Sequence, residues 1–196
     1  MLDYFAQTLS TIQKSIASLD EQTFLHLLED CYNAVTNGNK VIVSGLGKNV
    51  PICEKFVGTM NSFGINAAFL HTNSAIHGDL GIIKNGDVIM LLSKSGNTAE
   101  TLVLLSHVMK RKAVIWCVTF NKDSELYKGC PNGLAIDLDN EGDQWNIVPN
   151  NSTTLYLIML QGLAIKLADK LGITLDDFKT NHPGGSIGEI LKTGGR

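Results

Sequence analysis

Five short apolar runs alternate with longer connections along this 196-residue chain. Runs of consecutive apolar residues are typical of strands that are buried on both faces of a sheet. They cover residues 40–44, 66–70, 88–92, 113–119 and 134–138. Because every connection is long enough for a crossover, the strands are expected to lie parallel, with right-handed connections. The alternation therefore predicts an α/β fold, with helices on the faces of a parallel sheet.

Helical segments flank the sheet region at both ends. Residues 1–37 hold two amphipathic stretches, and Asp20 is placed to cap the second one. We expect this helix pair to pack on the core or to supply a dimer face. A long apolar helix is expected at 154–171, ended by Gly172. A chain of this length is expected to form a single domain, 1–196, with a core of its own.

Composition excludes several classes of protein. An apolar fraction of 44% and a charged fraction of 18% are ordinary for a globular chain. The net charge of -3 argues against a nucleic-acid partner, because binding to a phosphate backbone needs positive charge. No apolar run reaches membrane-spanning length and no basic leader precedes one, so we expect a cytoplasmic protein without a membrane partner. Four widely spaced cysteines are expected to be packed thiols: Cys31, Cys53, Cys117 and Cys130.

The loop at residues 93–98, Ser-Lys-Ser-Gly-Asn-Thr, lies between the run 88–92 and a helical segment that starts near Glu100. The first N–H groups of a helix have no internal partner, and the helix dipole favours negative charge there. Three hydroxyls add donors, and the glycine lets the backbone approach closely. The loop therefore predicts a binding site for a phosphate ester. Asn97 or Thr98 is also expected to cap the helix, which does not compete with phosphate binding.

A second glycine turn, Gly45-Leu46-Gly47-Lys48, follows the run 40–44. It lacks the third glycine of a dinucleotide fingerprint, and no acidic residue closes the next run, so NAD binding is rejected. Lys48 is either a solvated surface lysine or a cation that reaches a phosphate or a developing oxyanion. Ligands of parallel sheets bind at the carboxyl ends of strands, where both turns are expected, so together they favour a phosphate ligand.

The connection at residues 71–81 carries His77 and Asp79. The plain interpretation is local hydrogen bonding, with Asp79 turning against the preceding glycine. The alternative is a metal site, for which only these two side chains lie close together in the sequence.

Three other titratable side chains lie in loops or at a helix start. Glu141 belongs to the loop 139–149 and is either a functional group or a solvated loop acid. His182 precedes a proline and is either projected from a rigid turn or held at an interface. Glu100 is either a functional group or a first-turn charge that the helix dipole favours.

Five motifs occur in order at fitting separations: Gly45-Leu46-Gly47-Lys48, His77-Gly78-Asp79-Leu80-Gly81, Ser93-Lys94-Ser95-Gly96-Asn97-Thr98-Ala99-Glu100, Pro149-Asn150-Asn151-Ser152-Thr153-Thr154 and His182-Pro183-Gly184-Gly185. Over residues 35–192 the chain resembles the sugar isomerase (SIS) domain of D-arabinose 5-phosphate isomerases. The third motif marks any SIS domain. The second and fifth are more specific to this isomerase branch.

The resemblance implies a three-layer sandwich with a five-stranded parallel sheet of flavodoxin-like order. It implies interconversion of D-arabinose 5-phosphate and D-ribulose 5-phosphate by a homodimer or homotetramer with active sites at subunit interfaces, without a cofactor or a catalytic metal. The residues that fall on the family's catalytic positions are Lys48, His77, Glu100, Glu141 and His182. The residues on or beside its phosphate-binding positions are Ser44, Gly45, Ser93, Ser95, Gly96, Asn97 and Thr98. Residues 181–192 would then be a C-terminal active-site tail.

The chain also departs from the family pattern. Ser74 stands where these isomerases usually have a glutamate, and residues 143–146, Asp-Gln-Trp-Asn, replace the usual Cys-Pro-Leu-Gly. Both departures fall at the sugar end of the expected pocket and bear on the choice of substrate. The tandem CBS domains that often follow are absent, which suggests a stand-alone form or a chain cut at the domain edge.

The expected reaction proceeds through an enediol, in which a base removes the proton next to the carbonyl. The base is one of His182, Glu141 and Glu100, and the sequence does not choose among them. Lys48 would stabilise the oxyanion, while the 93–98 loop anchors the phosphate. Two alternatives stay open: a sugar-phosphate sensor that binds without turnover, and an isomerase of another phosphosugar such as 6-phospho-3-hexulose.

Overall fold

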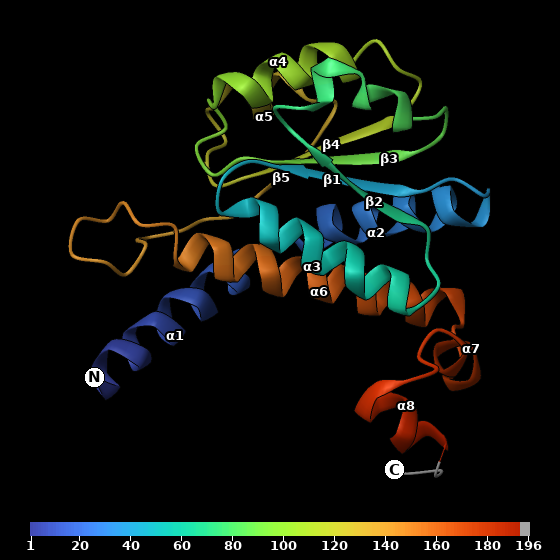
Figure 1. Ribbon diagram of the computed structural model, residues 1–196. Helices are drawn as coiled ribbons and strands as arrows, with labels where there is room; N and C mark the ends of the chain where they lie inside the picture. Colours follow the sequence, from blue (N-terminus) through green and yellow to red (C-terminus); the bar gives the residue numbers. More distant parts are fainter. Residues whose placement is uncertain (193–196) are drawn as a thin grey trace.

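The computed structural model describes residues 1–192 and shows a five-stranded parallel sheet between two layers of helices (Figure 1). The strand order is β2-β1-β3-β4-β5, and every neighbouring pair is parallel. The strands are β1 (Val41–Gly45), β2 (Ala67–His71), β3 (Val88–Leu92), β4 (Val114–Thr119) and β5 (Asn132–Ala135). This order is the flavodoxin-like one, so the predicted three-layer α/β fold is confirmed.

Helices cover both faces of the sheet. On one face lie α2 (Glu21–Thr36), α3 (Asn49–Ser62) and α6 (Asn151–Leu171), which enclose the larger core together with β1, β3 and β4. On the other face lie α4 (Ala99–Val108), α5 (Glu125–Gly129) and the 3-10 turns η1 (Ala75–His77) and η2 (Asp79–Ile82). Three more helices lie outside these layers: α1 (Leu2–Ala17), α7 (Leu175–Thr180) and α8 (Gly185–Lys192). Within residues 1–192, none of these helices combines the length and apolarity that crossing a bilayer requires.

Polar atoms in the larger core find partners. The Tyr156 hydroxyl donates to the Val118 carbonyl at 3.0 Å, and the Trp116 indole N–H donates to Asp30 at 2.9 Å. Both rings are buried, so these bonds remove the cost of placing a polar atom in an apolar core. They also fix α6 and α2 against the same strand, β4.

Three elements differ from the sequence expectation. Strand β5 begins at Asn132, directly after Pro131, since proline has no N–H for the ladder. Helix α6 begins at Asn151, three residues earlier than the expected 154. The sequence does not predict helix α8, because Gly185 and Gly188 lower helix propensity.

The carboxyl ends of the strands share one edge of the sheet, at the left of Figure 1. The β5–α6 loop projects from this edge, and α6 runs from it to the opposite edge, where α7 and α8 follow. The Asn181 amide at that far edge donates to the Ser62 carbonyl at the end of α3, at 3.3 Å. The fold therefore has a loop edge that can bind a ligand and a far edge that carries the C-terminal tail.

Candidate functional site

The 93–98 loop curls over the first turn of α4. The hydroxyl oxygens of Ser93 and Thr98 lie 3.0 Å apart, and the N–H of Gly96 donates to Ser93 Oγ at 3.2 Å. The N–H of Asn97 donates to Ser95 Oγ, also at 3.2 Å. Gly96 adopts φ +64°, and a Cβ there would collide with Ser124. The predicted phosphate-binding side chains therefore lie together at a helix N-terminus.

The prediction that the side chain of Asn97 or Thr98 caps α4 is wrong. Thr98 occupies the N-cap position, but its side chain makes no capping bond and pairs with Ser93 instead. The Asn97 side chain accepts from the N–H of Glu125 at the start of α5, at 2.9 Å. Both candidate caps thus have other partners. The N–H groups of Thr101 and Leu102 donate to the Thr98 carbonyl, so within residues 1–192 the two N–H groups before them are the ones left for an anion.

The loop is braced from behind by the β4–α5 connection. The Lys94 carbonyl accepts from the N–H of Phe120 and from the Thr119 hydroxyl, both at 3.1 Å. The Gly96 carbonyl accepts from the N–H of Leu126 at 3.0 Å. Because its backbone is held by these bonds, the loop is already shaped before any ligand binds.

Glu141 is fully buried, so the interpretation as a solvated loop acid is wrong. One carboxylate oxygen lies 2.6 Å from Lys94 Nζ and accepts from the Ser152 hydroxyl at 2.6 Å. The other accepts from the backbone N–H of Asn150 at 3.0 Å and of Ser152 at 2.9 Å. Burial alone would raise the pKa of Glu141, but these donors, Lys94 first, hold the pKa below its ordinary value. Glu141 thereby provides the acceptor for two backbone N–H groups at the N-terminus of α6.

The end of β1 supplies three of the predicted residues. The hydroxyls of Ser44 and Thr72 lie 3.0 Å apart and are buried, which links the ends of β1 and β2. A Cβ on Gly45 would lie 2.9 Å from the Cβ of Asn49, so only glycine allows α3 to start this close to the strand. Lys48 is exposed at the start of α3 and is free to reach over the loop edge.

His77 and Glu100 line one cavity of about 480 Å³, which lies between η1 and the first turn of α4. Thr72 lines it as well, so the cavity adjoins the buried hydroxyl pair at the ends of β1 and β2. Asp79 lines a different cavity, of about 400 Å³, together with His71. Among residues 1–192 no three His, Cys, Asp or Glu side chains gather as metal ligands would. The titratable groups that share the cavity at the start of α4 are therefore His77 and Glu100.

His182 lies between α7 and α8, and Figure 1 shows these two helices at the far edge, away from the carboxyl ends of the strands. Its ring stacks on Phe178 with 4.0 Å between centroids, and its Nδ1 lies 2.9 Å from the Phe178 carbonyl oxygen. A single chain therefore does not bring His182 to the 93–98 loop.

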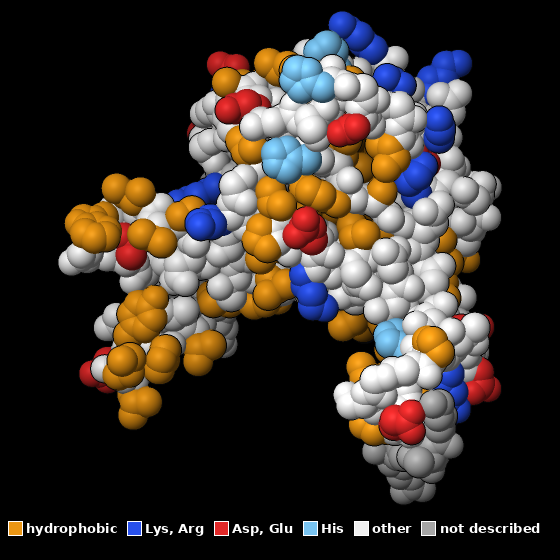
Figure 2. All heavy atoms as spheres, viewed as in Figure 1, with side chains coloured by type: hydrophobic (Ala, Val, Ile, Leu, Met, Phe, Trp, Pro, Cys, Tyr) orange, Lys and Arg blue, Asp and Glu red, His pale blue; other side chains and the backbone are white. Residues whose placement is uncertain are grey.

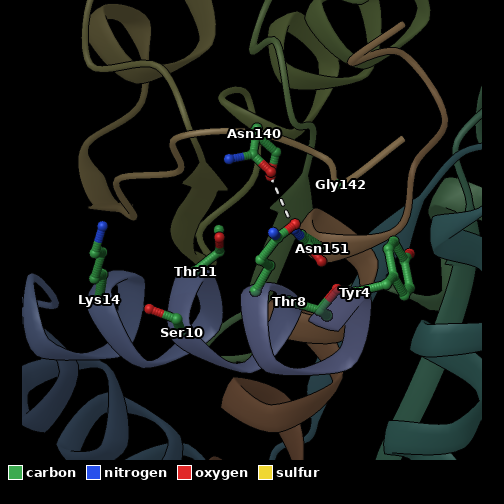
Figure 3. A pocket seen from close by; sticks show the side chains of 9 residues that line it. Tyr4, Thr8, Ser10, Thr11, Lys14, Asn140, Gly142 and Asn151 are labelled. Atoms are coloured by element: carbon green, nitrogen blue, oxygen red, sulfur yellow. Dashed lines mark hydrogen bonds between the residues drawn. The ribbon is translucent and has the colours of Figure 1, made fainter. Parts of the chain in front are cut away.

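A polar cavity of about 300 Å³ separates α1 from the β5–α6 loop (Figure 3). Asn140 and Gly142, which flank Glu141, line one side, and Thr8 and Thr11 of α1 line the other. The Thr8 hydroxyl oxygen is buried without a hydrogen-bond partner. Sequence reasoning missed this cavity because α1 was expected only to bury an apolar stripe; its two threonines, three residues apart, were the available signal.

Sequence reasoning also gave no role to two polar partners of Glu141. Lys94 belongs to the predicted phosphate-binding motif, and its ammonium contacts Glu141 of the β5–α6 loop. Ser152 belongs to the fourth motif and had no role of its own, and its side chain and N–H both bond Glu141. The signal for Lys94 was a lysine within a turn otherwise made of small polar residues.

Comparisons with known proteins identify the family of this chain. Arabinose 5-phosphate isomerase KdsD of Yersinia pestis is 33% identical over 185 residues, which are 94% of this chain and 56% of that protein. KdsD of Pseudomonas aeruginosa is 35% identical over 161 residues, 82% of this chain and 49% of that one. The chain thus spans about half the length of these curated relatives. An Escherichia coli CFT073 protein, solved in complex with a sugar phosphate, has a TM-score of 0.85 and 29% identity, over 92% of this chain and 94% of that one. Since the SIS domain model also matches residues 35–166, the chain belongs to the SIS domain family.

Proposed function

We propose that this protein is an aldose–ketose isomerase that interconverts D-arabinose 5-phosphate and D-ribulose 5-phosphate. The observation that carries the proposal is the 93–98 loop, whose hydroxyls converge at the N-terminus of α4 beside the cavity of His77 and Glu100. The KdsD relatives, named as arabinose 5-phosphate isomerases, support the choice of substrate.

The phosphate anchors the substrate in this proposal. The N–H groups of Gly96 and Asn97 now donate to side-chain oxygens of the loop itself. A phosphate dianion accepts more strongly than a hydroxyl, because charge-assisted hydrogen bonds are about twice as strong as neutral ones. Binding therefore exchanges these internal bonds for bonds to the phosphate, with little change in the braced backbone.

Proton transfer next to the carbonyl follows from this anchoring. The sugar extends from the loop into the cavity that Glu100 and His77 line. Glu100 is the base that this chain can supply there, while Lys48 stabilises the enediolate oxygen. The reaction moves a proton within one molecule and oxidises the substrate at one carbon while reducing it at the next, so it balances without a redox cofactor.

A second copy of the chain completes the site in this proposal, by bringing the partner's His182 to the loop edge. Apolar side chains gather over α1 and over the β5–α6 loop in Figure 2, as a surface for a second copy requires. Leu2 is 81% exposed, Leu9 67% and Ile147 72%. The proposed assembly is a homodimer or a homotetramer.

A coupled turnover assay over a panel of pentose and hexose phosphates tests the function. We expect D-arabinose 5-phosphate to be converted fastest and Glu100→Gln to lower kcat by about a hundredfold or more. The matched control is Glu125→Gln, which changes a first-turn glutamate of α5 rather than of α4. Tight binding of sugar phosphates without turnover would overturn the proposal in favour of a sensor, and preference for a hexulose phosphate would overturn the substrate.

A further inference from the structure

Glu141 and Lys94 form a short ion pair, with 2.6 Å between Oε1 and Nζ. We propose that the two act as one unit: Glu141 orients the Lys94 ammonium at the 93–98 loop, and Lys94 is the group that touches the substrate phosphate. This inference rests on the proposed function for the identity of the substrate. It makes Glu141 a positioning residue and removes it from the candidates for the catalytic base.

The surroundings of Glu141 argue against a direct role in proton transfer. Its side chain has no exposed surface, so a sugar on the loop cannot reach the carboxylate. Its two oxygens already accept from the Lys94 ammonium, the Ser152 hydroxyl and two backbone N–H groups. A carboxylate offers about four acceptor positions, and four donors occupy them here. A base needs a free lone pair aimed at the substrate, which Glu141 lacks.

Lys94 has the opposite properties. It is the second residue of the 93–98 loop, and its carbonyl is fixed by Thr119 and Phe120. Its side chain is 41% exposed, although one face of the ammonium contacts a fully buried carboxylate. An ammonium has three N–H donors, and among residues 1–192 Glu141 is the one carboxylate within 4 Å of it. Donors of Lys94 therefore remain for a ligand on the loop.

The pairing explains why a buried carboxylate lies beside a site for an anion. If Glu141 had no cationic partner, its charge would repel a phosphate on the loop, because water screens a buried charge poorly. Paired, it cancels the charge of Lys94 and limits the rotamers of a long, flexible side chain. A preoriented ammonium loses less conformational freedom on binding than a free one does. The unit thereby presents an oriented N–H donor to the phosphate without a net negative charge beside it.

The test compares steady-state kinetics and inorganic phosphate binding by calorimetry in the whole protein. The variants are Lys94→Met, Glu141→Gln, the double variant and Lys94→Arg, and the matched control is Lys122→Met, an exposed lysine of the β4–α5 connection. We expect Lys94→Met to raise KM and the Kd for phosphate about tenfold or more, with kcat changed less than threefold. Lys94→Arg should recover most of the affinity, since the charge returns.

Glu141→Gln should weaken affinity as Lys94→Met does, and the double variant should be no weaker than Lys94→Met alone. A hundredfold loss of kcat in Glu141→Gln with unchanged KM would overturn the inference and make Glu141 the base. Equal affinity in Lys94→Met and Lys122→Met would overturn it as well. Phosphate binding is read without turnover, so if no sugar is isomerised while binding still depends on Lys94, the proposed reaction fails and the Lys94–Glu141 unit stands.

Discussion

The hydroxyl oxygens of Ser93 and Thr98 lie 3.0 Å apart, so side chains close the 93–98 loop across its two ends. This contact explains why Thr98, although it stands at the N-cap of α4, leaves the first turn uncapped. An anion that enters the loop meets both hydroxyls and the free N–H groups together.

Removing one of these hydroxyls should weaken phosphate binding specifically. Thr98→Val keeps the shape of the side chain and removes its donor, so we expect KM for the sugar phosphate to rise about tenfold, the value of one hydrogen bond to a charged group. The turnover number should change little, because the proton-transfer groups stay in place. The control is Ser106→Ala, which removes an exposed hydroxyl of the same helix that bonds only the Val103 carbonyl. An equal KM in Thr98→Val and wild type would contradict a role of Thr98 in anchoring.

The backbone of the loop should be as sensitive as its hydroxyls. Gly96→Ala places a Cβ at φ +64° and against Ser124. We therefore expect the loop to shift and phosphate binding to be lost. The free energy of unfolding should fall by about 1–3 kcal/mol. Gly58→Ala is the matched control: among residues 1–192, no atom beyond its chain neighbours and the nearby backbone of α3 lies within 4 Å of its added Cβ. Alanine in α3 should raise stability by up to about 1 kcal/mol. Calorimetric phosphate titrations and thermal unfolding of both variants check this. Wild-type affinity in Gly96→Ala would contradict the assigned loop geometry.

Completion of the site by a second copy can be tested by mixing inactive variants. His182→Gln and Lys48→Met should each be nearly inactive, because each lacks one group of every site. In a symmetric dimer, co-expression of both gives about half mixed dimers with one intact site each, hence about a quarter of wild-type activity. Recovery of this size supports a site shared between chains. No recovery, with mixed dimers verified by mass, would contradict a site shared between chains.

Asp87 should contribute to the acid sensitivity of the fold. Burial alone would raise its pKa, but the N–H groups of Lys84 and Lys40 and the Lys40 ammonium hold the pKa below the ordinary value. A group with a lowered folded pKa stabilises the protein at neutral pH, and this contribution is lost as the pH falls from about 4 through the folded pKa.

Asp87→Asn should therefore lower stability by about 3 kcal/mol at pH 7 and flatten the decline of Tm below about pH 4. Asp123→Asn, on a carboxylate that is 95% exposed, is the control and should leave the curve unchanged. Thermal unfolding between about pH 2.5 and 7 measures both. If Tm fell with pH in parallel for Asp87→Asn and wild type, this origin of acid sensitivity would be contradicted.

The sheet and its ligand edge could be predicted because their signals are local. Each strand is a continuous apolar run, and each turn with glycine or hydroxyl residues directly follows one. The Lys94–Glu141 ion pair could not be predicted, because its two residues come from loops that lie far apart in the sequence. Lys94 lies in the connection after β3 and Glu141 in the one after β5. Nothing in the acidic stretch 139–143 marks Glu141 as the one carboxylate that is buried.

The position of His182 at the far edge could have been predicted from the length of the helix that precedes it. Helix α6 starts at the loop edge and has 21 residues, which at about 1.5 Å per residue carry the chain about 32 Å to the far edge. A helix of this length, already expected at 154–171, places the following histidine away from the strands' carboxyl ends. Resemblance to a motif assigns a residue to a site without saying which chain supplies it.

The most direct measurement is a crystal structure with D-arabinose 5-phosphate bound. We expect the phosphate to lie within hydrogen-bond distance of the Ser93, Ser95 and Thr98 hydroxyls, with the sugar extending toward Glu100. Phosphate density at another position, or a 93–98 loop that keeps its internal hydrogen bonds while the sugar binds elsewhere, would contradict it.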